Sequence, residues 1–297
     1  MAESDSTYPP RLSVSNQDQA AVKKMRSKLE GVNQIAASLF RDSDIHRSSD
    51  FAKDQETLPA YPVSFTAASQ IVAACENLLT LGDLLVHYKD GKSMRLGGRS
   101  NGPYACVRAA IECAANAYWI AGPSLSKTRV ARSLLWELEE AKNFWNAVES
   151  NRKLWPEENE YNDTGRSREK DYEDIKKLAD ESGVVSGEAL PKLQNNITQR
   201  LEWVEEHNHS ARERGLKLTW QVCSGQAHGR RWSQMLLGHR TVISEHPEEQ
   251  ATRYLVALDY SNLMTQVLAA SLMIEDAYEL YRRRAFPRSS GESFFRS

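Results

Sequence analysis

The sequence has 297 residues and a formal net charge of −2, with 40% hydrophobic and 26% charged residues. This length suits one large domain or two small ones, and the composition indicates a globular body with polar flanks. The small net charge excludes a protein whose overall charge attracts nucleic acid or membranes, although a local basic groove remains compatible with it.

Neither targeting nor membrane insertion is indicated. The first residues, MAESDSTYPPRLS, lack the basic start and apolar run of a signal peptide. The two most apolar stretches, 104–120 and 255–274, contain charged residues, so we expect buried helices and no contact with a membrane. The four cysteines form no CxxC pair, which indicates reduced thiols in a cytoplasmic protein.

The apolar residues follow a helical period nearly everywhere, and no convincing strand pattern occurs. We therefore expect an all-α multi-helix bundle that forms a single domain over 17–286, with its core at 64–286. Polar tails at 1–16 and 287–297 are expected to be disordered. The helices predicted from the apolar period and from breaks at proline and glycine are 16–40, 64–88, 103–122, 126–150, one or two short helices before 206, 217–238, and a long C-terminal helix from 247 to about 284.

No metal or cofactor site is expected. Glu206 and His209 form one Glu-x-x-His pair, whereas helical di-metal sites need two such pairs and further carboxylates on facing helices. The glycine-rich segment 97–102 lacks the preceding strand and the Gly-Lys-Ser/Thr ending of a phosphate loop. We interpret these features as a solvated helix end and a turn.

Polar residues interrupt the apolar helix at 103–122 in a regular way. Arg108, Glu112 and Asn116 are spaced i, i+4, i+8, which places them on one side of the helix. A helix that is apolar all round is usually buried, and buried charges must be paired, so we expect Arg108 to pair with Glu112.

A second polar stripe lies in the string TWQVCSGQAHGRRWSQML of the helix at 217–238. Glycine inside a helix costs roughly 1 kcal/mol relative to alanine, so Gly225 and Gly229 indicate close approach of another helix or a ligand. We expect this helix to pack directly against the helix at 103–122. The stripe consists of Gln221, Ser224, His228 and Arg231.

These stripes have two interpretations. In the first they form a structural network that fixes helix register. In the second they meet in one site, where His228 acts as base or acid, Glu112 orients it and Arg108 holds an anion such as phosphate. The substrate would then be positioned by Asn116, Gln221, Ser224 and Arg231.

The pairing of RAAIECAANAYWI with a later WQVCSGQAHGRRW resembles uncharacterised bacterial helical proteins common in actinobacteria. That group resembles the HEPN superfamily. The resemblance implies a helical bundle, often a homodimer, in a superfamily that contains RNA-cutting toxins, defence factors and inactive partners.

The active motif of that superfamily is an arginine, four to six residues, and a histidine. It occurs here as Arg41/His46, Arg200/His207 and Arg240/His246, about as often as chance alone produces. None of these pairs lies in the SGQAHG segment, so no residue role is transferred from the motif.

The sequence therefore predicts a HEPN-like helical protein that binds RNA or a nucleotide, with metal-independent ribonuclease activity in stress or phage defence as the implied role. The first alternative is a non-catalytic interaction protein, in which the last helix makes a dimer or partner interface. The second is a small-molecule enzyme or sensor with a pocket inside the bundle.

Overall fold

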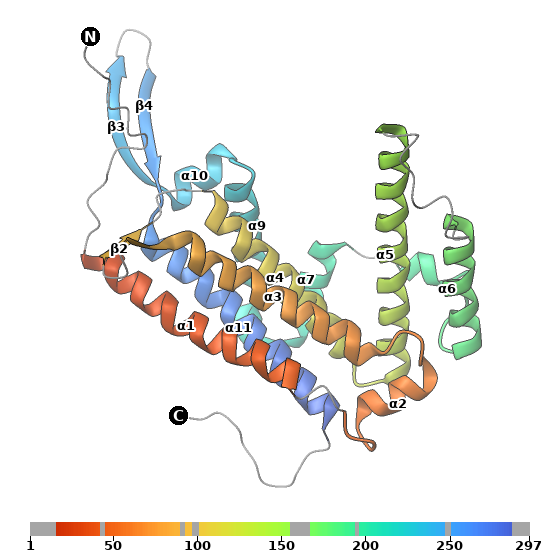
Figure 1. Cartoon of the computed structure of the whole chain (residues 1–297). Coiled ribbons are helices and arrows are strands. Elements are labelled where there is room, and N and C mark those ends of the chain that lie inside the picture. The colour runs from red at the N-terminus through yellow and green to blue at the C-terminus, as the bar shows by residue number, and fades with distance from the viewer. Residues whose placement is uncertain are drawn as a thin grey trace. The chain divides into compact units, whose positions relative to one another are not determined.

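The computed structural model describes residues 16–41, 45–89, 93–96, 101–154, 167–193, 196–246 and 251–286 (Figure 1). These residues are predominantly helical, which confirms the all-α expectation in outline, and two antiparallel hairpins accompany the helices. The tails expected at 1–16 and 287–297 lie outside the described residues, apart from Asn16, with which the first helix begins. Among the described helices, none combines the length and the apolar character needed to cross a membrane.

The chain divides into two compact units, each assembled from three stretches of sequence. The first unit comprises Met1–Arg41, Ile71–Ala115 and Val204–Asp276, and the second comprises Asp42–Gln70, Asn116–Trp203 and Ala277–Ser297. The single domain expected over 17–286 stays a prediction, and the two units are described separately below.

The first unit contains α1 (Asn16–Arg41), α8 (His209–Glu213), α9 (Leu216–Ala227) and α10 (Arg231–Leu237), with most of α3 (Val63–Leu85), α4 (Gly102–Ala121) and α11 (Tyr260–Ala285). In α1 an apolar face that includes Val22, Met25, Val32 and Leu39 is buried. α1, α3 and α11 run side by side, with Leu29 against Gly82 and Lys28 paired with Glu275 (Figure 1). The core of this unit includes Val22, Met25, Val32, Ile71, Leu78, Leu81, Val107, Ile111, Leu263, Val267 and Met273.

The second unit contains α2 (Asp50–Thr57), α5 (Ser126–Leu154), α6 (Arg168–Ser182), the 3-10 helix η2 (Leu190–Leu193) and most of α7 (Ile197–His207). The first turns of α3 and the last turns of α4 and α11 complete it. α6 lies alongside α5, where the Trp145 indole donates to Asp171 at 2.9 Å (Figure 1).

Two predicted helices are shorter than expected because strands replace their ends. The second predicted helix ends at Leu85, and the following VHYK forms β1 (Val86–Lys89), which pairs with β2 (Ser93–Leu96). Valine and tyrosine favour strands, and here this preference outweighs the helical period of the apolar residues.

The long last helix expected from 247 is wrong in its first part. β3 (His239–His246) pairs with β4 (Ala251–Ala257), and α11 begins only at Tyr260 and has 26 residues. Asp259 caps it, because its carboxylate accepts the backbone N–H of Asn262 at 2.9 Å. A short apolar run such as LVAL does not distinguish a strand from a buried helix, so the period alone misassigned it.

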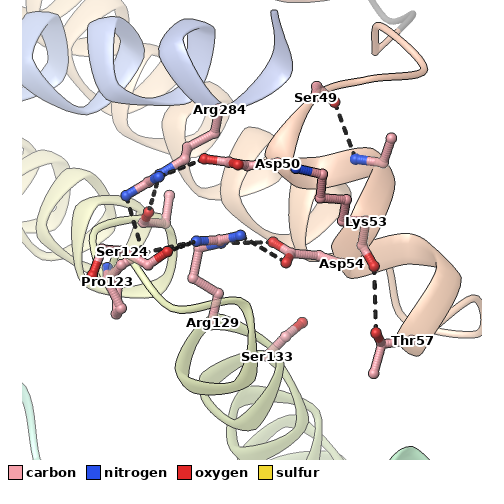
Figure 2. A network of polar contacts seen from close by, with 12 residues as sticks. Ser49, Asp50, Lys53, Asp54, Thr57, Pro123, Ser124, Arg129, Ser133 and Arg284 are labelled. Atoms are coloured by element: carbon pink, nitrogen blue, oxygen red, sulfur yellow. Dashed lines mark hydrogen bonds and ion pairs between the residues drawn. The ribbon is translucent and has the colours of Figure 1, made fainter. Parts of the chain in front are cut away.

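A buried ion pair organises the second unit (Figure 2). The Arg129 guanidinium donates to both oxygens of Asp54, at 2.7 and 2.8 Å, and to the carbonyls of Pro123 and Ser124, each at 2.9 Å. The two charged side chains are 2% and 0% exposed. Asp54 lies on α2, a helix that the sequence did not predict and that starts at the N-cap Ser49.

A second arginine reinforces the same region. Arg284, near the end of α11, pairs with Asp50 and donates to the carbonyls of Ala121, Gly122 and Pro123 (Figure 2). Burial raises the pKa of Asp50, but the hydrogen bond and charge of Arg284 outweigh it, so the net pKa lies below the ordinary value. The loop after α4 therefore has several of its carbonyls satisfied by arginine side chains.

The buried pair predicts a large loss of stability on truncation. Asp54→Ala leaves the Arg129 cation buried and unpaired, and we expect the free energy of unfolding to fall by about 3–5 kcal/mol. Urea denaturation of both proteins measures this. The control is Glu30→Ala, which breaks the exposed Arg26–Glu30 pair and should cost less than about 1 kcal/mol. Equal effects of the two substitutions would contradict the role assigned to the buried pair.

Candidate functional site

Three predicted residues of the first unit meet in one cluster. On α4, Arg108 donates through Nε to Oε1 of Glu112 at 2.8 Å. The Nη1 atom of the same guanidinium lies 3.0 Å from Nε2 of His228, which is 120 positions further along the chain. Arg108 thereby joins α4 to the end of the SGQAHG helix through its side chain.

The contact between Arg108 and His228 indicates one tautomer of the imidazole. A guanidinium carries only donors, so Nε2 must accept and therefore carries no proton. This hydrogen bond corresponds to the tautomer with its proton on Nδ1, an assignment that follows from the hydrogen-bond network. His228 is exposed, and a group that displaced it from Arg108 would release the basic lone pair of Nε2.

Trp220 completes the cluster and was not among the predicted site residues. Its indole N–H donates to Oε1 of Glu112 at 2.7 Å, so one carboxylate oxygen accepts from both Trp220 and Arg108. The sequence signal was weak, since a half-buried tryptophan needs an acceptor for its N–H but its position does not say which. Glu112 thus orients Arg108 directly, and His228 only through Arg108.

The exposure of the ion pair corrects the expectation of a buried one. The Arg108 and Glu112 side chains are 30% and 26% exposed. Their attraction is screened by solvent, and the pair contributes less to stability than a buried pair such as Arg129–Asp54. The guanidinium also keeps N–H groups that have no partner among the described residues, and an anion could accept from these.

A left-handed turn ends α9 at this cluster, so the single helix expected over 217–238 is wrong. Gly229 has a φ of 65°, the N–H of Arg230 donates to the carbonyl of Gly225 at 2.8 Å, and that of Gly229 to the carbonyl of Gln226 at 3.0 Å. This pair of bonds is the Schellman motif, which glycine favours because it has no Cβ. His228 therefore occupies the C-cap position of α9.

Gly225 also has a role different from the expected one. A Cβ at this position would lie 2.6 Å from Cζ2 of Trp232 and 2.9 Å from Cβ of Ser233. Both neighbours belong to α10, so Gly225 allows α10 to fold back onto α9.

The remaining predicted site residues are dispersed. Asn116 is buried in the second unit, where its amide interacts with Gln70 at 3.5 Å and with Arg200 at 3.2 Å, so the structure does not place it with His228. Gln221 is exposed on α9, Ser224 is half-buried one turn before His228, and Arg231 is exposed at the start of α10. The structure therefore assembles the predicted site only in part.

The sequence around this cluster is strongly basic. No aspartate or glutamate occurs from 214 to 244, although arginine, lysine and histidine recur throughout this segment. Arg230, Arg231 and Arg240 are exposed there. A chain with a net charge of −2 thus has a locally basic segment at the turn between α9 and α10, and the run without acidic residues was the sequence signal that could have located it.

Other chemistries lack support among the described residues. Cys223, which lies next to Ser224 in α9, is buried, and burial raises the pKa of its thiol to about 12, so it stays protonated at neutral pH. Within the described ranges no group of three or more histidine, cysteine, aspartate or glutamate side chains is arranged to hold a metal ion.

Comparison with known proteins does not assign the chain to a family, since no protein-family model, no curated protein and no solved structure matches it.

The left-handed turn predicts that alanine changes the free energy of unfolding in opposite directions at two glycines. Gly229→Ala forces a Cβ into a left-handed conformation and should lower the free energy of unfolding by about 1–2 kcal/mol. Gly31→Ala, in the interior of α1 with nothing within 4 Å of the added Cβ, should raise it by about 0.5–1 kcal/mol. Urea denaturation of both variants measures these changes. An unchanged stability of Gly229→Ala would mean that the turn does not constrain the chain.

Proposed function

We propose that this protein is a HEPN-like helical protein that binds RNA or a nucleotide at the cluster of Arg108 and His228, and that it cleaves RNA without a metal. The observation that carries the proposal is the 3.0 Å contact between Arg108 and His228. It joins the two short segments on which the resemblance to HEPN-like proteins is based.

The pair combines the two properties that phosphodiester chemistry requires. A guanidinium binds phosphate oxygens and stabilises their charge, and an imidazole transfers protons near neutral pH. Glu112 keeps the Arg108 guanidinium oriented through Nε, so that Nη1 is available on the side of His228. Arg230 and Arg231 add exposed positive charge on the adjacent turn and would attract a polyanion.

Phosphate binding would also activate the histidine. A phosphate oxygen that accepts from Nη1 of Arg108 takes the place of Nε2 of His228, whose lone pair becomes available. Nε2 then accepts the proton of a ribose 2′-hydroxyl, and the 2′ oxygen attacks the adjacent phosphorus. The bond from phosphorus to the 5′ oxygen breaks and that oxygen takes a proton from water. The hydroxide so formed takes the proton back from the imidazolium, and a 2′,3′-cyclic phosphate remains.

One observation favours the alternative of a non-catalytic interaction protein. α10 presents large apolar side chains to solvent, with Trp232, Met235 and Leu236 being 52%, 42% and 61% exposed. The last helix, which was expected to supply such an interface, has few exposed side chains, namely Thr265, Leu268, Glu279 and Arg283. A protein partner or a homodimer contact would therefore use α10 in preference to α11.

Binding is tested with a fluorescently labelled RNA oligonucleotide and anisotropy. Arg108→Gln removes the charged donor and should raise Kd at least about tenfold, as expected for a charge-assisted hydrogen bond. Arg26→Gln on α1 alters the net charge equally but should change Kd by less than about twofold, because its charge is exposed and screened. Absence of RNA or nucleotide binding by the unmodified protein would end the proposal.

Catalysis is tested separately from binding and folding. His228→Ala should abolish RNA cleavage, while oligonucleotide binding persists and the free energy of unfolding falls by no more than about 1–2 kcal/mol, since the side chain is exposed. Gel analysis of the products and urea denaturation provide the two readouts. A variant that unfolds as readily as Asp54→Ala would identify His228 as a structural residue, and full retention of cleavage would exclude it as the base.

A further inference from the structure

Trp232 is held in an unusual position for a tryptophan. Its side chain is 52% exposed, although tryptophan generally buries most of its large surface. The edge of its six-membered ring rests on Gly225 of α9, where a Cβ would lie 2.6 Å from Cζ2. One edge of the indole therefore lies against backbone, and about half of the residue's surface remains accessible.

The turn that carries Trp232 is well fixed. Ser233 is fully buried and its hydroxyl donates to the carbonyl of Arg230 at 2.8 Å. The Schellman bonds at Gly229 and Arg230 fix the preceding residues. A rigid, supported aromatic ring loses little conformational freedom when a ligand packs on it, which favours binding.

The charge around the indole favours a nucleic acid over a protein as the partner. Arg230 and Arg231 directly precede Trp232 in the sequence and are exposed, and no acidic residue occurs from 214 to 244. Arg240 reaches α10 and contacts the sulfur of Met235 at 3.7 Å, so a further cation lies along the apolar face. Proteins that bind single-stranded nucleic acids combine exposed aromatic rings, on which the bases stack, with nearby cations that bind the phosphates.

We propose that Trp232 stacks an unpaired nucleobase whose neighbouring phosphates contact Arg230 and Arg231 and lead to the cluster of Arg108 and His228. The inference rests on the proposed function, and it makes Trp232 the residue that selects single strands. Bases inside a duplex are already stacked on one another and offer no face to the indole. A purine covers more of the ring than a pyrimidine, so purine-rich strands should bind more tightly.

The experiment compares four labelled probes by anisotropy: oligoadenylate RNA, oligouridylate RNA of the same length, a blunt-ended RNA duplex and inorganic polyphosphate. For the unmodified protein we expect the order oligoadenylate, oligouridylate, then duplex. Trp232→Ala should raise Kd for oligoadenylate about tenfold, the range found for loss of one stacked base, and leave polyphosphate binding unchanged. Trp232→Phe keeps an aromatic face and should recover most of the affinity.

Leu236→Ala is the matched control, because Leu236 lies on the same helix, is 61% exposed and cannot stack on a base in this way. It should leave oligoadenylate binding within about twofold, since it removes no aromatic ring. Circular dichroism verifies that each variant is folded before its binding is measured.

Three results would overturn the inference. If Arg108→Gln loses RNA binding and Trp232→Ala does not, stacking is wrong and the proposed function stands. If the unmodified protein binds none of the RNA probes, the proposed function fails with it. If Trp232→Ala and Leu236→Ala both weaken self-association in sedimentation experiments and neither affects RNA binding, α10 is a contact between copies of this chain.

Discussion

Gly229 adopts a left-handed conformation, with φ at 65°, and this one turn controls the geometry of the candidate site. Because α9 ends there, His228 lies at its C-cap and reaches Arg108 on α4. Because the chain reverses there, α10 folds back onto Gly225 and Trp232 is supported by backbone while half of its surface stays exposed. A continuous helix through this segment would carry the side chains of α10 away from Gly225, and the basic turn would not exist.

The chain uses arginine–carboxylate pairs in two different ways. Arg129 and Asp54 are almost completely buried. Each nitrogen of the Arg129 guanidinium donates to a carboxylate or a carbonyl oxygen. Burial of both charges has a large desolvation cost, which only such complete bonding offsets. Arg108 and Glu112 are closer to solvent and contribute less to stability, but their arginine retains donors for a ligand. The degree of burial therefore separates a structural pair from a pair suited to binding.

The hydrogen bonds and the charge at the cluster both favour an anionic ligand. Glu112 accepts from Arg108 and Trp220 through one oxygen, which links α4 to α9 before any ligand is present. The acid-free segment 214–244 supplies positive charge where the pair is exposed, so the electrostatic field and the hydrogen-bond donors favour the same class of ligand. Preorganised donors of this kind are effective because they need not reorganise when the anion arrives.

The sequence by itself determined the features that depend on helix pitch. The apolar period predicted α1, α4 and most of α5, and the i, i+4 spacing predicted the pairing of Arg108 with Glu112, because such neighbours meet on any regular helix. It could not place Asn116, which follows the same spacing but lies in the other unit with Arg200 as its partner.

Tertiary structure alone decided the break after Ala227, the strands before α11 and the contact of Arg108 with His228. Glycine in a helix interior costs only roughly 1 kcal/mol, so the local preference of Gly229 for ending the helix over continuing it is small. The break is stabilised by the packing of Trp232 and Ser233 on Gly225 and by the hydrogen bonds between helices. The sequence alone does not show that these residues are close in space.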